Sequence, residues 1–242
     1  MKAVFSQIVS SEAREPDAPN FDKLARAYRW MEYLSFGPLL WHCRCEYLSR
    51  LGHCRKALVI GDGDGRYAAQ LLEANPFVHV DAVDASPAML KALLRRAGKN
   101  AKRVHVDSID ARAWHPSSSE PYDLVVTHFF LDCLNTSEVR SLASKIRHAV
   151  TPDAMWIVSE FSVPSSLFGQ LIARPLVAVL YLAFGLLTGL KVRSLPDHTK
   201  ALSLSGFSMS TNRLRAIGLL ASELWTISRN HEVLVHQPIN GK

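Results

Sequence analysis

Cysteine is scarce in this sequence, and the spacing of the few thiols argues against two common roles. The four cysteines are Cys43, Cys45, Cys54 and Cys133. A small secreted domain held by disulfides is usually much richer in cysteine. A structural zinc site usually takes Cys-x-x-Cys pairs, and the stretch from His42 to Cys54 lacks that spacing. We therefore expect buried, reduced thiols, no metal site and a cytoplasmic protein, because the first residues also lack the apolar region of a secretory signal.

Long uninterrupted apolar runs are missing as well. The most apolar stretch, 167–190, contains Arg174, and its charge-free part is shorter than the roughly twenty residues that a membrane span requires. A helix that is apolar all round must nevertheless be buried in protein or lipid. We expect 167–193 to cover a bound substrate or to contact the inner face of a membrane peripherally. Burial between two copies of the chain is the alternative.

Internal repeats are absent, which disfavours solenoid architectures, and the composition is that of a globular protein. Of the 242 residues, 48% are hydrophobic and 21% charged, with a net charge of +6. The basic residues between Arg95 and Arg103 have no interleaved aromatic residues, which disfavours nucleic acid as a partner. The sequence predicts a flexible leader over 1–20 and a single domain over 21–242. Within that domain, 21–51 is predicted to be a helical cover and 162–200 an apolar helical insertion.

A glycine-rich loop is the feature around which the chain is organised. Four apolar residues, 57–60, predict a buried parallel strand that runs into Gly61-Asp62-Gly63-Asp64-Gly65, and a helix over 66–74 follows. The third glycine comes one position too early for a dinucleotide fingerprint. Asp62 and Asp64 would also repel a pyrophosphate. The loop therefore favours a cationic cofactor without phosphate, such as S-adenosylmethionine. An ordinary strand–turn–helix is the alternative.

Further candidate cofactor ligands follow the next predicted strands. Asp84 comes after a strand over 78–83, about twenty residues beyond the loop, where an acid can bind both ribose hydroxyls. Ser86 and Pro87 then begin a helix as cap and first residue. A strand over 103–106 leads to Asp110, which we expect to accept from the adenine amino group. The remaining candidates for cofactor contact are Ala85, Met89, Ala111 and Thr127.

Histidine and aromatic residues are the candidates for binding the second substrate, which accepts a group from the cofactor. A strand over 122–127 runs into His128 and Phe129 at the edge where chemistry occurs in an open parallel sheet. His128 is our candidate for a general base or an acceptor-orienting group, with a structural histidine as the alternative. Tyr28 and Tyr33 lie in the helical cover, which is broken at Gly37-Pro38. We expect these tyrosines, with Phe129, to contact the substrate, although packing in the core would also explain them.

Four segments in this order resemble the class I S-adenosylmethionine-dependent methyltransferases. They are ALVIGDGDGR, VDAVDASPAML, VDSIDARAW and YDLVVTHFFLDCL. The resemblance implies an α/β, Rossmann-like, seven-stranded and mostly parallel sheet of order 3-2-1-4-5-7-6, with the last strand antiparallel and helices on both faces. The family usually has an acid at the position of Val59, and Asp62 is our candidate for its electrostatic role.

A looser similarity concerns the acceptor. The segments FDKLARAYRWMEYLSFGPLLWHCR and LPDHTKALSLSGF look like parts of the ubiquinone/menaquinone biosynthesis C-methyltransferases. That similarity implies methyl transfer to a small, lipophilic, quinone- or lipid-like acceptor. An RNA methyltransferase and a non-catalytic S-adenosylmethionine-binding module are the alternatives. The loop spacing disfavours a nicotinamide-dependent oxidoreductase.

Overall fold

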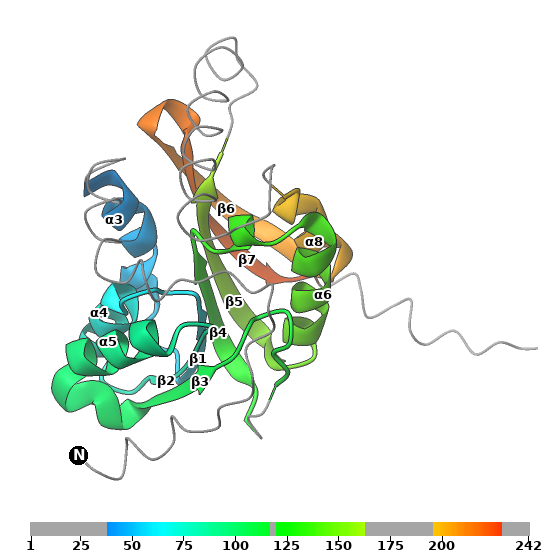
Figure 1. Cartoon of the computed structure of the whole chain (residues 1–242). Helices are drawn as coiled ribbons and strands as arrows, with labels where there is room; N and C mark the ends of the chain where they lie inside the picture. The colour runs from blue at the N-terminus through cyan, green and yellow to red at the C-terminus, as the bar shows by residue number, and fades with distance from the viewer. Residues whose placement is uncertain (1–37, 117–119, 163–195, 229–242) are drawn as a thin grey trace, which may run out of the picture.

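A seven-stranded sheet forms the centre of the computed structural model, which describes residues 38–116, 120–162 and 196–228 (Figure 1). The strands are β1 (Lys56–Ile60), β2 (His79–Asp84), β3 (Val104–Ser108), β4 (Tyr122–His128), β5 (Val150–Phe161), β6 (Phe207–Arg215) and β7 (Leu220–Ile227). Their order is β3-β2-β1-β4-β5-β7-β6. Strands β1 to β5 are parallel to one another, whereas β7 is antiparallel to both β5 and β6. The structure confirms the predicted order and direction.

Helices cover both faces of the sheet (Figure 1). They are α3 (Pro38–Cys45), α4 (Arg66–Ala74), α5 (Pro87–Ala97), α6 (Thr136–Arg147) and α8 (His198–Leu204), with short 3₁₀ turns η2 (Leu48–Arg50), η3 (Gly98–Arg103), η4 (Leu131–Cys133) and η6 (Ala216–Gly218). One face of the sheet packs against α4 and α5, in a cluster that includes Leu71 and Leu93. The other packs against α6 and α8, in a cluster that includes Leu142 and Leu202. Each face therefore has its own apolar core.

Local sequence signals explain where several helices begin. Helix α4 starts directly after Gly65, whose left-handed backbone (φ 77°) turns the chain out of the loop. Ser86 caps α5 by accepting a hydrogen bond from the Met89 amide, with Pro87 as the first helical residue, as predicted. A capping box between Asn135 and Glu138 begins α6.

The strand boundaries at the end of the sheet differ from the prediction. The sequence predicts strands over 154–160 and 206–211, whereas β5 begins at Val150 and β6 continues to Arg215. Most side chains of β6 are exposed, because β6 is an edge strand with little to cover it. An edge strand of this kind lacks the apolar–polar alternation on which a sequence-based boundary depends.

Several predicted features lie outside the described residues: the leader over 1–20, Tyr28 and Tyr33, and the apolar stretch 167–193. Gly37, within the predicted joint, also lies outside the described residues, and the chain from Pro38 to Cys45 is helical as α3. Within the part of the chain that the structure describes, no helix is long and apolar enough to cross a membrane. The same residues contain no group of three or more metal-ligating side chains.

Candidate active site

The candidate residues gather at one edge of the sheet because β1 to β4 are parallel and end together. Ile60, the last residue of β1, pairs with Val83 on β2 and with Thr127 on β4. Asp84 pairs with Ser108 at the end of β3. The glycine loop, Asp84, the turn after β3 and the turn after β4 consequently follow the carboxyl ends of adjacent strands, where open α/β sheets bind their ligands.

Close packing demands glycine at two positions of the loop. Gly61 has φ +69°, and a Cβ atom there would lie 2.2 Å from Cδ2 of Phe130. Gly65 has φ +77°, and a Cβ atom there would lie 2.5 Å from the Cα atom of Leu93 on α5. Any side chain would therefore push the loop away from the β4 turn or from α5.

The two carboxylates of the loop have different surroundings. Asp64 forms ion pairs with Arg96 on α5 (2.6 Å) and with Arg66 (3.2 Å), and its carbonyl accepts from Arg96 Nε. We predicted that both acids would suit a cationic cofactor, but the negative charge of Asp64 is already compensated by these two arginines. Asp64 therefore fastens the loop to α5.

Asp62, the other acid of the loop, is also buried, with 6% of its surface exposed against 8% for Asp64. Its Oδ2 accepts from the Ala68 amide at 2.8 Å, whereas Oδ1 has no hydrogen-bond partner among the described residues. Burial raises the pKa of Asp62 to about 6, and the positive charge of Arg44 opposes that rise. Since β1 carries Val59 where the resembled family has an acid, Asp62 provides the buried carboxylate here.

Asp84 lies half-buried at the end of β2 and shapes the start of α5. Its Oδ1 accepts from the Ser86 amide at 2.8 Å. Ala85 is half-buried as well, whereas Met89 is buried beneath the first turn of α5. The predicted ribose acid therefore ends the strand next to β1, with its carboxylate oriented by the backbone amide of Ser86.

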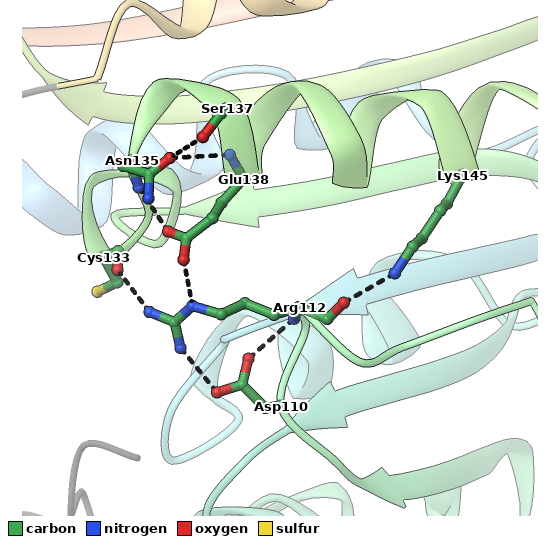
Figure 2. A network of polar contacts seen from close by, with 7 residues as sticks. All are labelled: Asp110, Arg112, Cys133, Asn135, Ser137, Glu138 and Lys145. Carbon is green, nitrogen blue, oxygen red and sulfur yellow. Dashed lines mark hydrogen bonds and ion pairs between the residues drawn. The ribbon is translucent and has the colours of Figure 1, made fainter. Parts of the chain in front are cut away.

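Asp110 belongs to a network of polar contacts between the turn after β3 and α6 (Figure 2). Its two carboxylate oxygens accept from the backbone and from the guanidinium of Arg112, each at 2.8 Å. Arg112 also donates to Glu138, and its carbonyl accepts from Lys145, again at 2.8 Å. The network fixes Asp110 relative to α6. We did not predict Arg112, because its partners on α6, Glu138 and Lys145, lie far along the chain.

His128 is buried at the end of β4, with 2% of its surface exposed. Its Nδ1 lies 2.9 Å from Oγ of Ser159, and its Nε2 has no partner among the described residues. The edge of the ring contacts Tyr67, with 4.4 Å between the centroids. Burial, and then the charge of Arg44, hold the pKa of His128 well below its ordinary value of 6.5. The imidazole is therefore neutral at physiological pH.

The turn after β4 carries the predicted acceptor residue Phe129. Its backbone has φ +53°, which is rare for a bulky residue. The ring lies 5.2 Å from that of Phe161, and the guanidinium of Arg44 lies 5.5 Å from its centre. The buried Glu160 holds the turn by accepting from the amides of Phe130 (3.1 Å) and Leu131 (2.7 Å).

Two predicted cofactor ligands have side chains in the core. Thr127 is fully buried, and its hydroxyl accepts from Nε1 of Trp156 at 3.0 Å. Ala111 packs in the same cluster as Trp156, on the face covered by α6 and α8. These two residues can reach a ligand through their backbone only. Besides Arg112, the residues of the site that were missed from the sequence are Arg44, Ser159, Glu160 and Phe161.

Comparison with known proteins gives one family match. Residues 58–156 match the family described as a methyltransferase domain. Polyamine aminopropyltransferase 2 of Bacillus cereus is 28% identical over 114 residues, which are 43% of this chain and 31% of that protein. This chain thus spans about a third of the length of that curated relative.

Solved structures share the fold at low sequence identity. The mitomycin 7-O-methyltransferase MmcR has a TM-score of 0.62 at 15% identity, over 94% of this chain and 67% of that one. An O-methyltransferase family protein from Burkholderia thailandensis has a TM-score of 0.61 at 17% identity, over 94% and 68%. The DhpI–SAH complex has a TM-score of 0.61 at 15% identity, over 86% and 95%.

Proposed function

We propose that this chain, which carries the methyltransferase domain and the class I S-adenosylmethionine-dependent methyltransferase fold, transfers a methyl group to a small, lipophilic acceptor. S-adenosylmethionine is the cofactor that the domain match indicates, and it supplies the methyl group when bound. The observation that carries the proposal is the loop Gly61–Gly65, at the carboxyl edge of the sheet, in which the buried Asp62 has an oxygen without a hydrogen-bond partner among the described residues.

The residues of the loop fit the charge of this cofactor. Asp62 offers a buried oxygen, Oδ1, that lacks a hydrogen-bond donor among the described residues. A buried acceptor of this kind is costly unless a donor reaches it. The ammonium group of S-adenosylmethionine is such a donor, whereas a pyrophosphate would be repelled. We assign Asp62, together with the backbone of Gly61 and Gly63, to the methionine end of the cofactor.

The other cofactor contacts follow the order of the strands. Asp84 is assigned to the ribose hydroxyls and Asp110 to the adenine amino group, with Ala85, Met89 and Ala111 beside the nucleoside. The Arg112 network supports the Asp110 assignment because it holds the carboxylate in one orientation (Figure 2).

The acceptor side is assigned to the turn after β4. Phe129 and Phe161 form a half-buried aromatic pair there, which suits a lipophilic molecule. The apolar composition of 167–190 supports the same acceptor class, and also a peripheral contact with a membrane through 167–193. His128 is assigned as the group that takes a proton from the acceptor.

Calorimetry tests the cofactor assignment directly. The protein should bind S-adenosylmethionine and its demethylated product, S-adenosylhomocysteine, but not NAD. Asp84→Ala should weaken binding by about 1.5–3 kcal/mol, because charge-assisted hydrogen bonds to the ribose are lost. Asp153→Ala is the matched control, since Asp153 is exposed at the opposite end of the sheet, near the start of β5. Heat with NAD and none with either S-adenosyl compound would overturn the proposal.

A labelling experiment identifies the acceptor. The protein is incubated with methyl-labelled S-adenosylmethionine and with lipid, polar small-molecule and RNA fractions of a cell extract. We expect label in the lipid fraction. Label in the RNA fraction alone would show that the acceptor is RNA and would refute the lipophilic acceptor.

A further inference from the structure

Ser159 connects His128 to the end of α3. The serine hydroxyl lies 2.9 Å from Nδ1 of His128 and 3.3 Å from the carbonyl oxygen of Cys43. The neighbouring Ser222, which pairs with Ser159 across β5 and β7, donates to the same carbonyl at 2.9 Å. His128 itself pairs with Ser159 across β4 and β5. The contact therefore joins two adjacent strands to the backbone of α3.

Counting protons assigns the tautomer of His128. A carbonyl oxygen only accepts, and the hydroxyl of Ser159 has a single proton to give. Both contacts are satisfied when Ser159 donates to Cys43 and accepts from an Nδ1–H group of His128. The lone pair of the neutral imidazole then lies on Nε2. Nε2 is the buried atom that has no partner among the described residues.

The surroundings of the ring keep this base weak. The groups packed about it are Tyr67 from α4, Ser159 from β5 and the positive charge of Arg44 from α3. Burial and the charge of Arg44 both disfavour the imidazolium form. A weak base does not readily remove a proton from a carbon atom. It suffices for an O–H or N–H group, because that proton becomes strongly acidic as the heteroatom gains positive charge during methylation.

We propose that Ser159 is a positioning residue that holds His128 in the tautomer with its lone pair on Nε2, and that the acceptor is methylated on a hydroxyl or N–H group whose proton passes to Nε2. The acceptor heteroatom bonds to the methyl carbon, and the sulfur–methyl bond breaks with its electron pair returning to sulfur. The acceptor proton ends on His128, which becomes an imidazolium. The acceptor part of this inference rests on the proposed function.

Nitrogen NMR of the full chain, with ¹⁵N-labelled histidine and no ligand, tests the tautomer. Among the ten histidines, His128 is identified by the signal that a His128→Asn variant loses. We expect a protonated Nδ1 and an unprotonated Nε2. In Ser159→Ala the signal should move toward the Nε2–H form that free imidazole favours. Ser222→Ala removes the other hydroxyl that donates to the Cys43 carbonyl but leaves the contact between Ser159 and His128 in place, so it should leave the signal unchanged.

The wild-type spectrum alone can refute the tautomer assigned to His128, even if the Ser159→Ala variant fails to fold. An unprotonated Nδ1 in the wild-type protein would refute it. So would an equal shift in the Ser159 and Ser222 variants, because that result would indicate a general structural effect.

A ¹³C-labelled methyl group tests the acceptor class. The carbon shift of the product distinguishes a methyl group on oxygen or nitrogen from one on carbon, and a methyl group on carbon would refute the inference. With the acceptor fraction in hand, Ser159→Ala should reduce turnover about tenfold or more while leaving S-adenosylhomocysteine affinity within about twofold. Absence of transfer to any fraction would count against the proposed function, whereas the ligand-free spectrum would still decide the tautomer.

Discussion

Replacing Gly65 by alanine tests whether the glycine loop is shaped by packing as well as by backbone conformation. The added methyl group would lie 2.4 Å from Cβ and 2.5 Å from Cα of Leu93, so α5 itself must move. The left-handed backbone at φ +77° adds about 1–2 kcal/mol for any residue with a Cβ atom. Overpacking adds about 1–3 kcal/mol. We expect a total loss of about 2–5 kcal/mol in the free energy of unfolding.

Urea unfolding followed by circular dichroism measures this loss. Gly52→Ala is the matched control, because a Cβ atom there meets nothing within 4 Å and the backbone is not left-handed. That variant should be as stable as the wild type or slightly more stable. A Gly65→Ala variant within about 0.5 kcal/mol of the wild type would refute the reasoning. A Leu93→Ala partner change should not rescue Gly65→Ala, since the clash is with Cα and Cβ.

Two further predictions concern buried carboxylates. Asp62 binds its proton more tightly in the folded state, so the wild type should lose stability as pH rises from 3.8 to about 6. Asp62→Asn should therefore be more stable at pH 7, by up to about 3 kcal/mol in urea unfolding, yet bind S-adenosylhomocysteine more weakly. A variant that gains stability and keeps full affinity would remove Asp62 from the methionine site. For Glu160, burial and then Asp132 raise the pKa well above 4.5, so Glu160→Gln should gain stability relative to the wild type as pH rises above 4.5. Parallel stability curves for the two proteins would contradict this.

The sequence predicted the parts of the fold that depend on local patterns. Continuous apolar runs identify the central strands β1 and β4, and the Ser86-Pro87 pair identifies the start of α5. Each of these signals involves only a few consecutive residues, so it can be recognised without knowing how the chain packs. The order of the strands came from the family resemblance, and the structure confirms it.

The contacts that complete the site could not be predicted, because they join residues far apart. Ser159 and Cys43 are separated by 116 positions, and Arg96 and Asp64 by 32. No period or spacing in the sequence relates such pairs. Arg44 looks like an ordinary charged residue of an amphipathic helix, yet it is buried, with 2% of its surface exposed. Its effect on Asp62 and His128 becomes visible only when α3 is packed on the sheet.

The position of α3 has a consequence for where this domain can be divided. The family match starts at residue 58, downstream of the helix that brings the Arg44 charge to Asp62 and His128. A fragment that begins after α3 would keep the glycine-rich turn and the central strands. It would lose both the cation and the carbonyl that orients Ser159. Such a shortened protein would keep the cofactor loop beside an imidazole whose tautomer is no longer set through the Cys43 carbonyl and whose pKa is no longer lowered by Arg44.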